Sequence, residues 1–348
     1  MTIKLQDVHS ILIIRSGALG DLIYATAIID ALILEFGQDL EIDMIINPNV
    51  ADVLKNDPRL HTLYPLKYRK VPFYLSPEKL KVFFHSLKTP YDLLINLEEN
   101  SHFDALAKKI VAKKKLGAPF TKTQLLPNQQ HMVEIIKQMA APVCKQQNLD
   151  AAVPTLYGTP WAEVCSTYEL PEEYIVLNPS NSHANRNKIN YRAWPQGHWK
   201  SLISMIPSHI PLVLIAGKGE EDYFKEIQPY PDNIIDLTGK TPLPDLIGVI
   251  EHAQAIVTTD TGPAHLAAAV NTEIYVLIGP TYANLTGPYP TAQNRVHFIS
   301  MELDCSPCYN TEVMHACTDN ICMKQITPER VYSNLQTTLQ KFKTPSKG

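Results

Sequence analysis

The sequence lacks several features that mark particular classes of protein. No stretch approaches the run of about 20 apolar residues that spans a bilayer. The N-terminus has no charged segment followed by an apolar run and a small-residue cleavage site. Neither charge dominates, because 31 Lys and Arg residues stand against 35 Asp and Glu residues, for a net charge of −4. We therefore expect a cytoplasmic protein that does not bind nucleic acid.

The composition of the 348-residue chain is that of a globular enzyme. Apolar residues make up 45% and charged residues 19%, which is enough apolar surface to bury sizeable cores. That balance excludes a disordered chain, and the length favours two domains. Six cysteines in a reducing compartment are expected to be thiols or metal ligands rather than disulfides.

Short apolar runs alternate with amphipathic stretches, a pattern that predicts an α/β fold with parallel sheets. The expected strands cover residues 11–15, 41–46, 91–97, 114–117, 174–178, 212–216, 234–237, 255–259 and 274–278. The expected helices cover residues 21–36, 77–87, 129–139, 196–205, 220–227, 243–252, 263–270 and 328–341.

Two such series predict two Rossmann-like domains facing a central cleft. The first covers residues 1–150 and the second residues 173–327, with a linker over 151–172 where Pro and polar residues interrupt the periodicity. A final helix and tail occupy residues 328–348. Ligands of such sheets bind at the carboxyl ends of the strands, so the loops after strands are the candidate sites.

The loop after the first strand reads Gly17-Ala18-Leu19-Gly20-Asp21. It matches neither the dinucleotide fingerprint nor the Walker A loop. Gly17 and Gly20 allow close approach of a ligand, and a helix N-terminus favours an anion. Asp21 has two interpretations: a helix cap, or a carboxylate that accepts a proton from an attacking hydroxyl.

A second loop, Asp260-Thr261-Gly262-Pro263-Ala264-His265, also joins a strand to a helix. The amides of Thr261 and Gly262 could bind a phosphate. Asp260 is either a cap or a ligand of sugar hydroxyls, and His265 is either a core histidine or part of the site. Further candidates lie at or after neighbouring strands: Ser180, Lys188, Arg192, Gly279 and Thr281.

Three motifs together carry a family resemblance: residues 14–21, Arg192-x-Trp194-Pro195, and residues 260–266. From about residue 10 to 335, the chain resembles glycosyltransferase family 9, the ADP-heptose:lipopolysaccharide heptosyltransferases. The resemblance implies a GT-B fold with an N-terminal acceptor domain and a C-terminal nucleotide-sugar domain. It also implies an inverting transfer without a catalytic metal.

The resemblance assigns roles by motif. Asp21 matches the catalytic base, and Glu220, after Gly217, matches an acidic residue near the ribose or adenine, with Glu221 as an alternative. The family usually has Lys where this chain has Arg192, which leaves Lys188 as a possible substitute at the diphosphate. The donor-binding loop is matched by Asp260, Thr261, Gly262 and His265.

Four cysteines, Cys305, Cys308, Cys317 and Cys322, form a C-x2-C-x8-C-x4-C motif. This spacing predicts a structural tetrathiolate site for zinc or iron. A subset of the family that heptosylates autotransporter proteins is similar in using four cysteines to hold iron. The motif therefore keeps a protein acceptor open as an alternative.

Basic residues of the first half have either a solvated or an acceptor-binding role. One group is Lys67, Arg69 and Lys70, and a second is Lys108, Lys109, Lys113, Lys114 and Lys115. The resemblance places an anionic acceptor, such as the lipopolysaccharide inner core, in this half. The lysines could also contact inner-leaflet phospholipid, which predicts peripheral contact with the inner face of the inner membrane.

These observations predict an inverting glycosyltransferase that moves a heptose or related sugar from ADP-heptose to an acceptor hydroxyl. The expected acceptor is the lipopolysaccharide inner core, with an autotransporter protein as the alternative. Two other hypotheses remain: a nucleotide-sugar epimerase on the same scaffold, and a catalytically degenerate binding subunit.

Overall fold

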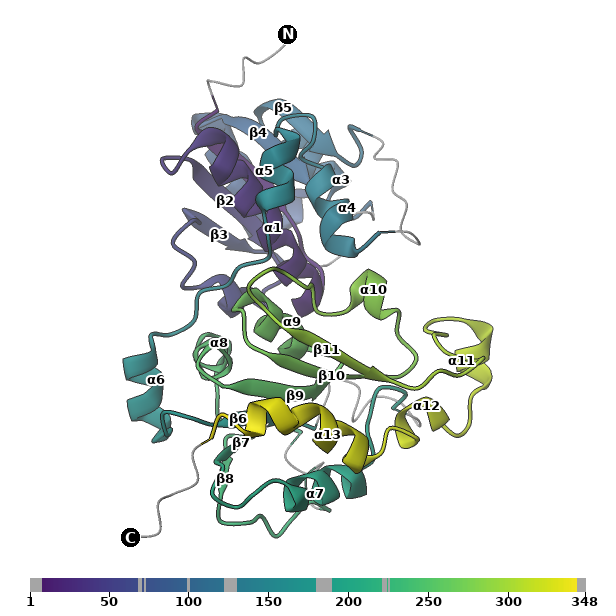
Figure 1. Ribbon diagram of the computed structural model, residues 1–348. Coiled ribbons are helices and arrows are strands. Elements are labelled where there is room, and N and C mark those ends of the chain that lie inside the picture. The colour runs from purple at the N-terminus through teal and green to yellow at the C-terminus, as the bar shows by residue number, and fades with distance from the viewer. Residues whose placement is uncertain are drawn as a thin grey trace. The chain divides into compact units, whose positions relative to one another are not determined.

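The computed structural model describes residues 8–67, 71, 73–98, 101–121, 130–179, 190–220, 224 and 226–342. The chain divides into two compact units, unit 1 (Met1–Tyr157) and unit 2 (Gly158–Gly348). Each unit has one parallel sheet with helices packed on it (Figure 1). Within the described ranges, no helix is both long and apolar enough to cross a membrane.

Unit 1 contains a five-stranded sheet in the order β3-β2-β1-β4-β5. Its strands are β1 (Ser10–Ile14), β2 (Glu41–Ile46), β3 (Thr62–Pro65), β4 (Tyr91–Asn96) and β5 (Ala112–Gly117). Every residue of β4 and four of the five in β1 are buried. Central parallel strands are covered on both faces, so they are buried along their length rather than at alternate residues.

The helices of unit 1 are α1 (Leu19–Phe36), α2 (Pro77–Lys88), α3 (Asp104–Lys109), α4 (Met132–Gln138) and α5 (Gln146–Ala151). Helix α1 packs against α4 and α5, and α2 packs against β3 and α3. Most of α1 is buried because its sequence is apolar on nearly all sides.

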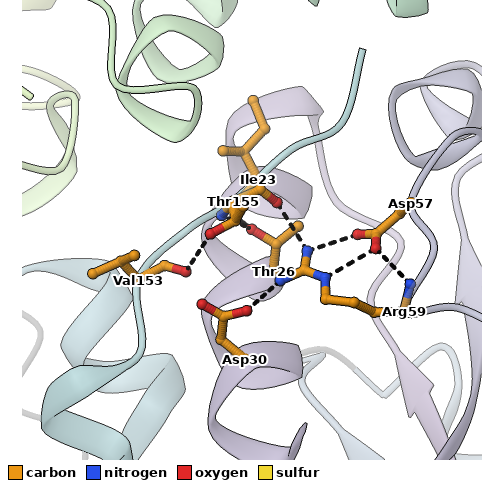
Figure 2. Close-up of polar contacts among 7 residues, drawn as sticks. All are labelled: Ile23, Thr26, Asp30, Asp57, Arg59, Val153 and Thr155. Atoms are coloured by element: carbon orange, nitrogen blue, oxygen red, sulfur yellow. Dashed lines mark hydrogen bonds and ion pairs between the residues drawn. The ribbon is translucent and has the colours of Figure 1, made fainter. Parts of the chain in front are cut away.

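A buried arginine holds the last segment of unit 1 in place (Figure 2). Arg59 forms an ion pair with Asp57 at 2.7 Å and another with Asp30. The same guanidinium donates to the Thr155 carbonyl at 3.0 Å, and the Thr155 amide donates to Thr26 Oγ1 on α1 at 3.0 Å. These contacts tie the chain after α5 to the body of unit 1.

Unit 2 contains a six-stranded sheet in the order β11-β10-β9-β6-β7-β8. Its strands are β6 (Ile175–Asn178), β7 (Leu212–Leu214), β8 (Ile234–Asp236), β9 (Ala255–Thr259), β10 (Ile274–Ile278) and β11 (Val296–Ser300). Its helices are α6 (Trp161–Tyr168), α7 (Gln196–Met205), α8 (Leu243–Glu251), α9 (Gly262–Ala269), α10 (Ala283–Thr286), α11 (Glu312–Ala316), α12 (Ile321–Lys324) and α13 (Pro328–Leu339).

The chain enters unit 2 through contacts with α8. The Thr159 amide donates to the Pro244 carbonyl at 2.9 Å, and its hydroxyl donates to Asp245 at 2.6 Å. A Cβ on Gly158 would lie 2.6 Å from the Gly248 amide nitrogen. No side chain fits there, which explains the glycine at this point.

The core of unit 2 is organised around two fully buried tryptophans, Trp194 and Trp199. Their rings meet edge to face, with centroids 4.9 Å apart. Trp194 Nε1 donates to the Ile326 carbonyl at 2.7 Å, which satisfies the polar atom of a buried indole. This bond joins the entrance of α7 to the segment before α13.

The predicted α/β class with parallel strands is confirmed. Two edge strands, β3 and β11, escaped prediction because their half-exposed residues form no apolar run. The interval 151–172, expected to be a linker, contains α6. The helix expected over residues 220–227 lies partly outside the described residues.

Candidate functional site

In unit 1 the candidate site begins at the loop between β1 and α1. The Asp21 carboxylate accepts the Ala18 amide at 3.0 Å and forms an ion pair with Arg15 at 2.9 Å. The Asp21 side chain is 39% exposed, whereas that of Arg15 is 10% exposed. Asp21 therefore caps the helix through one oxygen, and solvent still reaches the carboxylate. The cap does not exclude the role of a base.

Gly17 has a structural reason within this loop. A Cβ at this position would lie 2.5 Å from Asp21 Oδ2, so any side chain would displace the carboxylate. Gly20 is part of the first turn of α1. Gly17 thus allows Asp21 to fold back over its own loop.

Neighbouring strand ends hold the same loop. The buried Glu98 carboxylate accepts the Ser16 amide at 2.6 Å. Asn47, after β2, donates to the Gly17 carbonyl at 3.3 Å, and Arg15 donates to the Leu97 carbonyl at 2.9 Å. Glu98 was not among the residues predicted from the sequence, although an acidic pair after a buried strand is a signal for such a site.

In unit 2 the corresponding loop lies between β9 and α9. Thr261 receives a hydrogen bond from Asn178 at 3.2 Å, and Asn178 also donates to Thr258 at 2.9 Å. These bonds fix the carboxyl ends of the adjacent strands β6 and β9. Because the first amides of a helix have no partner within it, the N-terminus of α9 can receive an anion.

Several buried polar atoms around this loop have no hydrogen-bond partner among the residues described here. They are Arg192 Nε, Thr259 Oγ1, Asp260 Oδ1 and Thr281 Oγ1. A buried polar atom without a partner costs about 1–3 kcal/mol. Such atoms gathered at the ends of β9 and β10 and at the segment before α7 indicate a site that a polar ligand would complete.

Arg192 links this group of atoms to the cysteine segment. Its guanidinium donates to the Asp260 carbonyl at 3.1 Å and lies 4.6 Å from the centre of the Tyr309 ring. Asp260 is buried, and its Oδ1 lies 4.0 Å from His265 Nε2. The structure thus brings the predicted catalytic residue Arg192 together with two predicted donor-binding residues, Asp260 and His265.

The other predicted residues of the donor site have mixed outcomes. Glu220 lies beyond β7 and accepts the Gly217 amide at 2.9 Å, which closes a local turn. A Cβ on Gly279 would lie 2.6 Å from Met323 Sδ, so packing alone accounts for this glycine. Ser180, Lys188 and Glu221 lie outside the described residues.

The cysteine segment packs directly against the loop after β10. The amides of Cys308 and Tyr309 both donate to the Pro280 carbonyl, at 2.9 and 2.8 Å. Ser306 Oγ donates to the Gly279 carbonyl at 2.7 Å. The segment therefore supports the loop that carries Thr281.

The predicted tetrathiolate site is not assembled in the structure. All four cysteines are described, yet within the described ranges no group of three or more His, Cys, Asp or Glu side chains could hold a metal ion. Burial, followed by the charges of Cys308, Cys317 and Cys305, raises the pKa of Cys322 to about 11. The four thiols interact with one another, and a metal site built from them stays a prediction.

The predicted acceptor-binding residues are only partly described. Lys67 is exposed after β3, and Arg69 and Lys70 lie outside the described residues. In the second lysine group, Lys113 pairs with Asp92 at 2.6 Å, and Lys115 donates to the Ala107 carbonyl at 2.9 Å. The group is therefore not one uniform solvated face.

Two Rossmann-like units, each with polar groups gathered at the carboxyl ends of its strands, define a glycosyltransferase fold of the GT-B type. A family model described as glycosyltransferase family 9 (heptosyltransferase) matches residues 82–318. The chain belongs to this family, as the sequence motifs predict.

Individual relatives agree with this assignment. Lipopolysaccharide heptosyltransferase 3 of Escherichia coli is 25% identical over 287 residues, which cover 75% of this chain and 81% of that protein. A family 9 glycosyl transferase from Veillonella parvula DSM 2008 has a TM-score of 0.79 at 19% identity, covering 97% of this chain and 99% of that chain. E. coli heptosyltransferase WaaC with ADP has a TM-score of 0.68 at 18% identity, covering 94% of this chain and 99% of that chain.

Proposed function

We propose that this protein transfers a heptose from ADP-heptose to a hydroxyl group of the lipopolysaccharide inner core. The observation that carries the proposal is the set of buried, unpartnered polar atoms beside the N-terminus of α9, among the described residues of unit 2. The family and the names of the relatives supply the sugar and the acceptor class. The WaaC structure with ADP supports the adenine nucleotide.

In the proposed reaction, the acceptor hydroxyl oxygen attacks the anomeric carbon of the donor. The bond from that carbon to the diphosphate breaks, and the electron pair leaves with ADP. Asp21 takes the hydroxyl proton, a role that suits a partly exposed carboxylate fixed by Arg15. Attack opposite the leaving group inverts the anomeric centre.

The charge that develops on the departing diphosphate needs preorganised partners. The proposed partners are the amides at the start of α9 and the guanidinium of Arg192, which the Asp260 carbonyl and the Tyr309 ring hold in place. These groups would act in the role that a catalytic metal has in other transferases. Lys188 is a further candidate cation, and Glu220 is the candidate for the ribose or adenine.

A structural zinc or iron remains a proposal that rests on the spacing of the four cysteines alone. Metal analysis of the purified protein, compared with the variant Cys305→Ser/Cys308→Ser, tests it. We expect one metal per chain in the native protein and none in the variant. A native protein without metal would refute the proposal, and no step of the transfer depends on that metal.

The first experiment is a calorimetric titration with ADP, UDP, GDP and CDP in parallel. We expect a clear preference for ADP, followed by transfer from ADP-heptose to a heptose-deficient lipopolysaccharide acceptor. Binding without transfer to this acceptor would direct the assay to an autotransporter protein as acceptor. Conversion of the donor without any acceptor would indicate an epimerase, and failure to bind any nucleotide would indicate a binding subunit.

We also propose that the reaction takes place in the cytoplasm at the inner face of the inner membrane. The acceptor class supports this location, because a lipid-linked acceptor is available there to a protein that contacts the bilayer from one side.

A further inference from the structure

An unusual concentration of exposed apolar side chains lies on one part of unit 1. Tyr74, Leu75, Phe84 and Leu87 are 73%, 62%, 54% and 50% exposed. All four come from α2 and the short 3-10 turn that precedes it. Large apolar groups exposed singly are normal, but four within residues 73–88 require an explanation.

The spacing along α2 puts apolar and cationic residues on the same side of the helix. Lys81 lies three residues before Phe84. Leu87 and Lys88 follow Phe84 by three and four residues, so all four share one side of the helix. Both lysines are exposed, whereas Val82 and Ser86 on the opposite side are buried. Helix α2 is therefore amphipathic, and its outward side carries apolar groups next to positive charges.

Two other segments lie beside α2 and the turn before it. The Val111 amide donates to Ser86 on α2 at 3.2 Å, and the Val111 side chain is exposed. Lys109, at the end of α3, lies 5.3 Å from the centre of the Phe73 ring. We call the outward side of α2, together with the turn before it, the α2 face. It consists of Tyr74, Leu75, Lys81, Phe84, Leu87 and Lys88.

The kind of cation indicates which partner fits. All basic residues between positions 73 and 115, apart from histidines, are lysines, and none is an arginine. Protein interfaces are enriched in Arg and depleted in Lys. Interfacial membrane surfaces combine aromatic and aliphatic groups with lysines, which are attracted to anionic lipid headgroups. The α2 face has this second composition.

We propose that the α2 face is the surface through which unit 1 docks on an anionic lipid bilayer. The apolar side chains enter the headgroup boundary, and the lysines contact the lipid phosphates. Docking there would bring unit 1 to a lipid-linked acceptor. Only this purpose of docking rests on the proposed function; the docking itself does not. The contact is peripheral and reversible, because it uses a few side chains rather than a spanning segment.

The test is co-sedimentation of the full chain with vesicles, in the absence of donor and acceptor. Vesicles of phosphatidylethanolamine and phosphatidylglycerol are compared with vesicles of phosphatidylcholine alone. We expect binding to the anionic vesicles only, weakened by salt. Lys81→Glu/Lys88→Glu should reduce the partition coefficient by on the order of 100-fold. Phe84→Ser/Leu87→Ser should reduce it by about 10-fold or more.

Matched controls come from the same unit. Leu34, on α1, is 52% exposed, and Lys55 is exposed in the segment between β2 and β3. Leu34→Ser and Lys55→Glu should leave vesicle binding unchanged. Equal losses in the controls and the α2-face variants, or no loss in either α2-face variant, would overturn the proposal.

Two further measurements separate the possible failures. A native protein that binds ADP but does not sediment with vesicles would refute docking and leave the proposed function intact. A protein that sediments with vesicles but binds no nucleotide would refute the proposed function and leave docking intact. If Phe84→Ser/Leu87→Ser changes the oligomeric state in light scattering instead of vesicle binding, the face joins copies of this chain, and the lipid proposal is wrong.

Discussion

Each unit has a carboxylate where a strand is followed by a helix, but the two carboxylates differ in exposure and in hydrogen bonding. Both oxygens of Asp21 have partners, and the side chain remains partly exposed. Asp260 is buried, and one of its oxygens has no hydrogen-bond partner in the described part of the chain. The same local topology therefore satisfies the hydrogen bonds of one carboxylate and leaves an oxygen of the other without a hydrogen bond.

This difference separates two ways of building a functional site. A group that must move a proton benefits from a fixed position and access to solvent or substrate. A group that must bind a polar ligand can remain unsatisfied until the ligand arrives, at a cost to the stability of the free protein. The comparison therefore predicts opposite consequences for substitutions in the two loops.

The largest expected effect comes from Asp21→Asn. Asparagine keeps an oxygen for the Ala18 amide but cannot take a proton, so the transfer rate should fall about 10²- to 10⁴-fold. The affinity for ADP should remain unchanged, because the proposed donor site belongs to unit 2. Rates are measured with ADP-heptose, and Asp39→Asn, an exposed position in the same unit, is the control. Transfer near the native rate would show that Asp21 is only a cap.

The second effect concerns Arg192. Loss of a charge-assisted contact costs about 1.5–3 kcal/mol, so Arg192→Ala should weaken ADP binding by about 10- to 100-fold. The ADP affinity of Arg192→Lys should lie between those of the native protein and Arg192→Ala, because lysine keeps the charge without the planar guanidinium. Calorimetry measures the affinities, with the exposed Arg330→Ala as control. Unchanged affinity in Arg192→Ala would move the diphosphate contact elsewhere.

The third prediction concerns protein stability, which substitutions of Asp21 and Asp260 should change in opposite directions. Asp21→Ala removes a cap and should lower the unfolding free energy by about 1 kcal/mol. Asp260→Asn removes a buried, incompletely paired charge and should raise the free-protein melting temperature by about 2–4 °C, while weakening donor binding. Thermal scans without ligand measure both changes. A loss of stability in Asp260→Asn would contradict the view that this carboxylate awaits a ligand.

The smallest expected effect concerns a buried carboxylate outside both candidate loops, Asp43, which serves as a structural reference. Asp43 is buried beneath Tyr91, whose hydroxyl donates to it at 2.6 Å, and His61 Nδ1 lies 3.0 Å away. The hydrogen bond with Asp43 raises the pKa of His61, against the opposing effect of burial. The resulting stability is present below the unfolded histidine pKa and is lost as pH rises through the folded value.

Because the His61 side chain is 52% exposed, this contribution should not exceed about 0.5 kcal/mol. Denaturant unfolding between pH 5 and 8 should show it in the native protein and not in His61→Gln. Equal pH profiles for the two proteins would mean that the pair adds nothing to stability.

Sequence alone was enough for the class of fold, because buried parallel strands such as β1 and β10 are mostly apolar runs. The motifs also placed Asp21, Arg192 and Asp260 in strand-end loops. Sequence could not show which polar atoms lack partners, since pairing depends on contacts between distant segments, such as Arg192 with Asp260. It also predicted a metal site from cysteine spacing, and the described residues show no assembled ligand group, so that site stays a proposal.

The chain is anchored within each unit close to the boundary between them. Thr155 is tied to Arg59 and Thr159 to α8, so Leu156, Tyr157 and Gly158 alone connect the two attachments. Leu156 is buried, and Arg59 also lies 5.1 Å from the centre of the Tyr157 ring. A residue inserted between these anchors would lengthen a three-residue connection whose two ends are each fixed within their own unit.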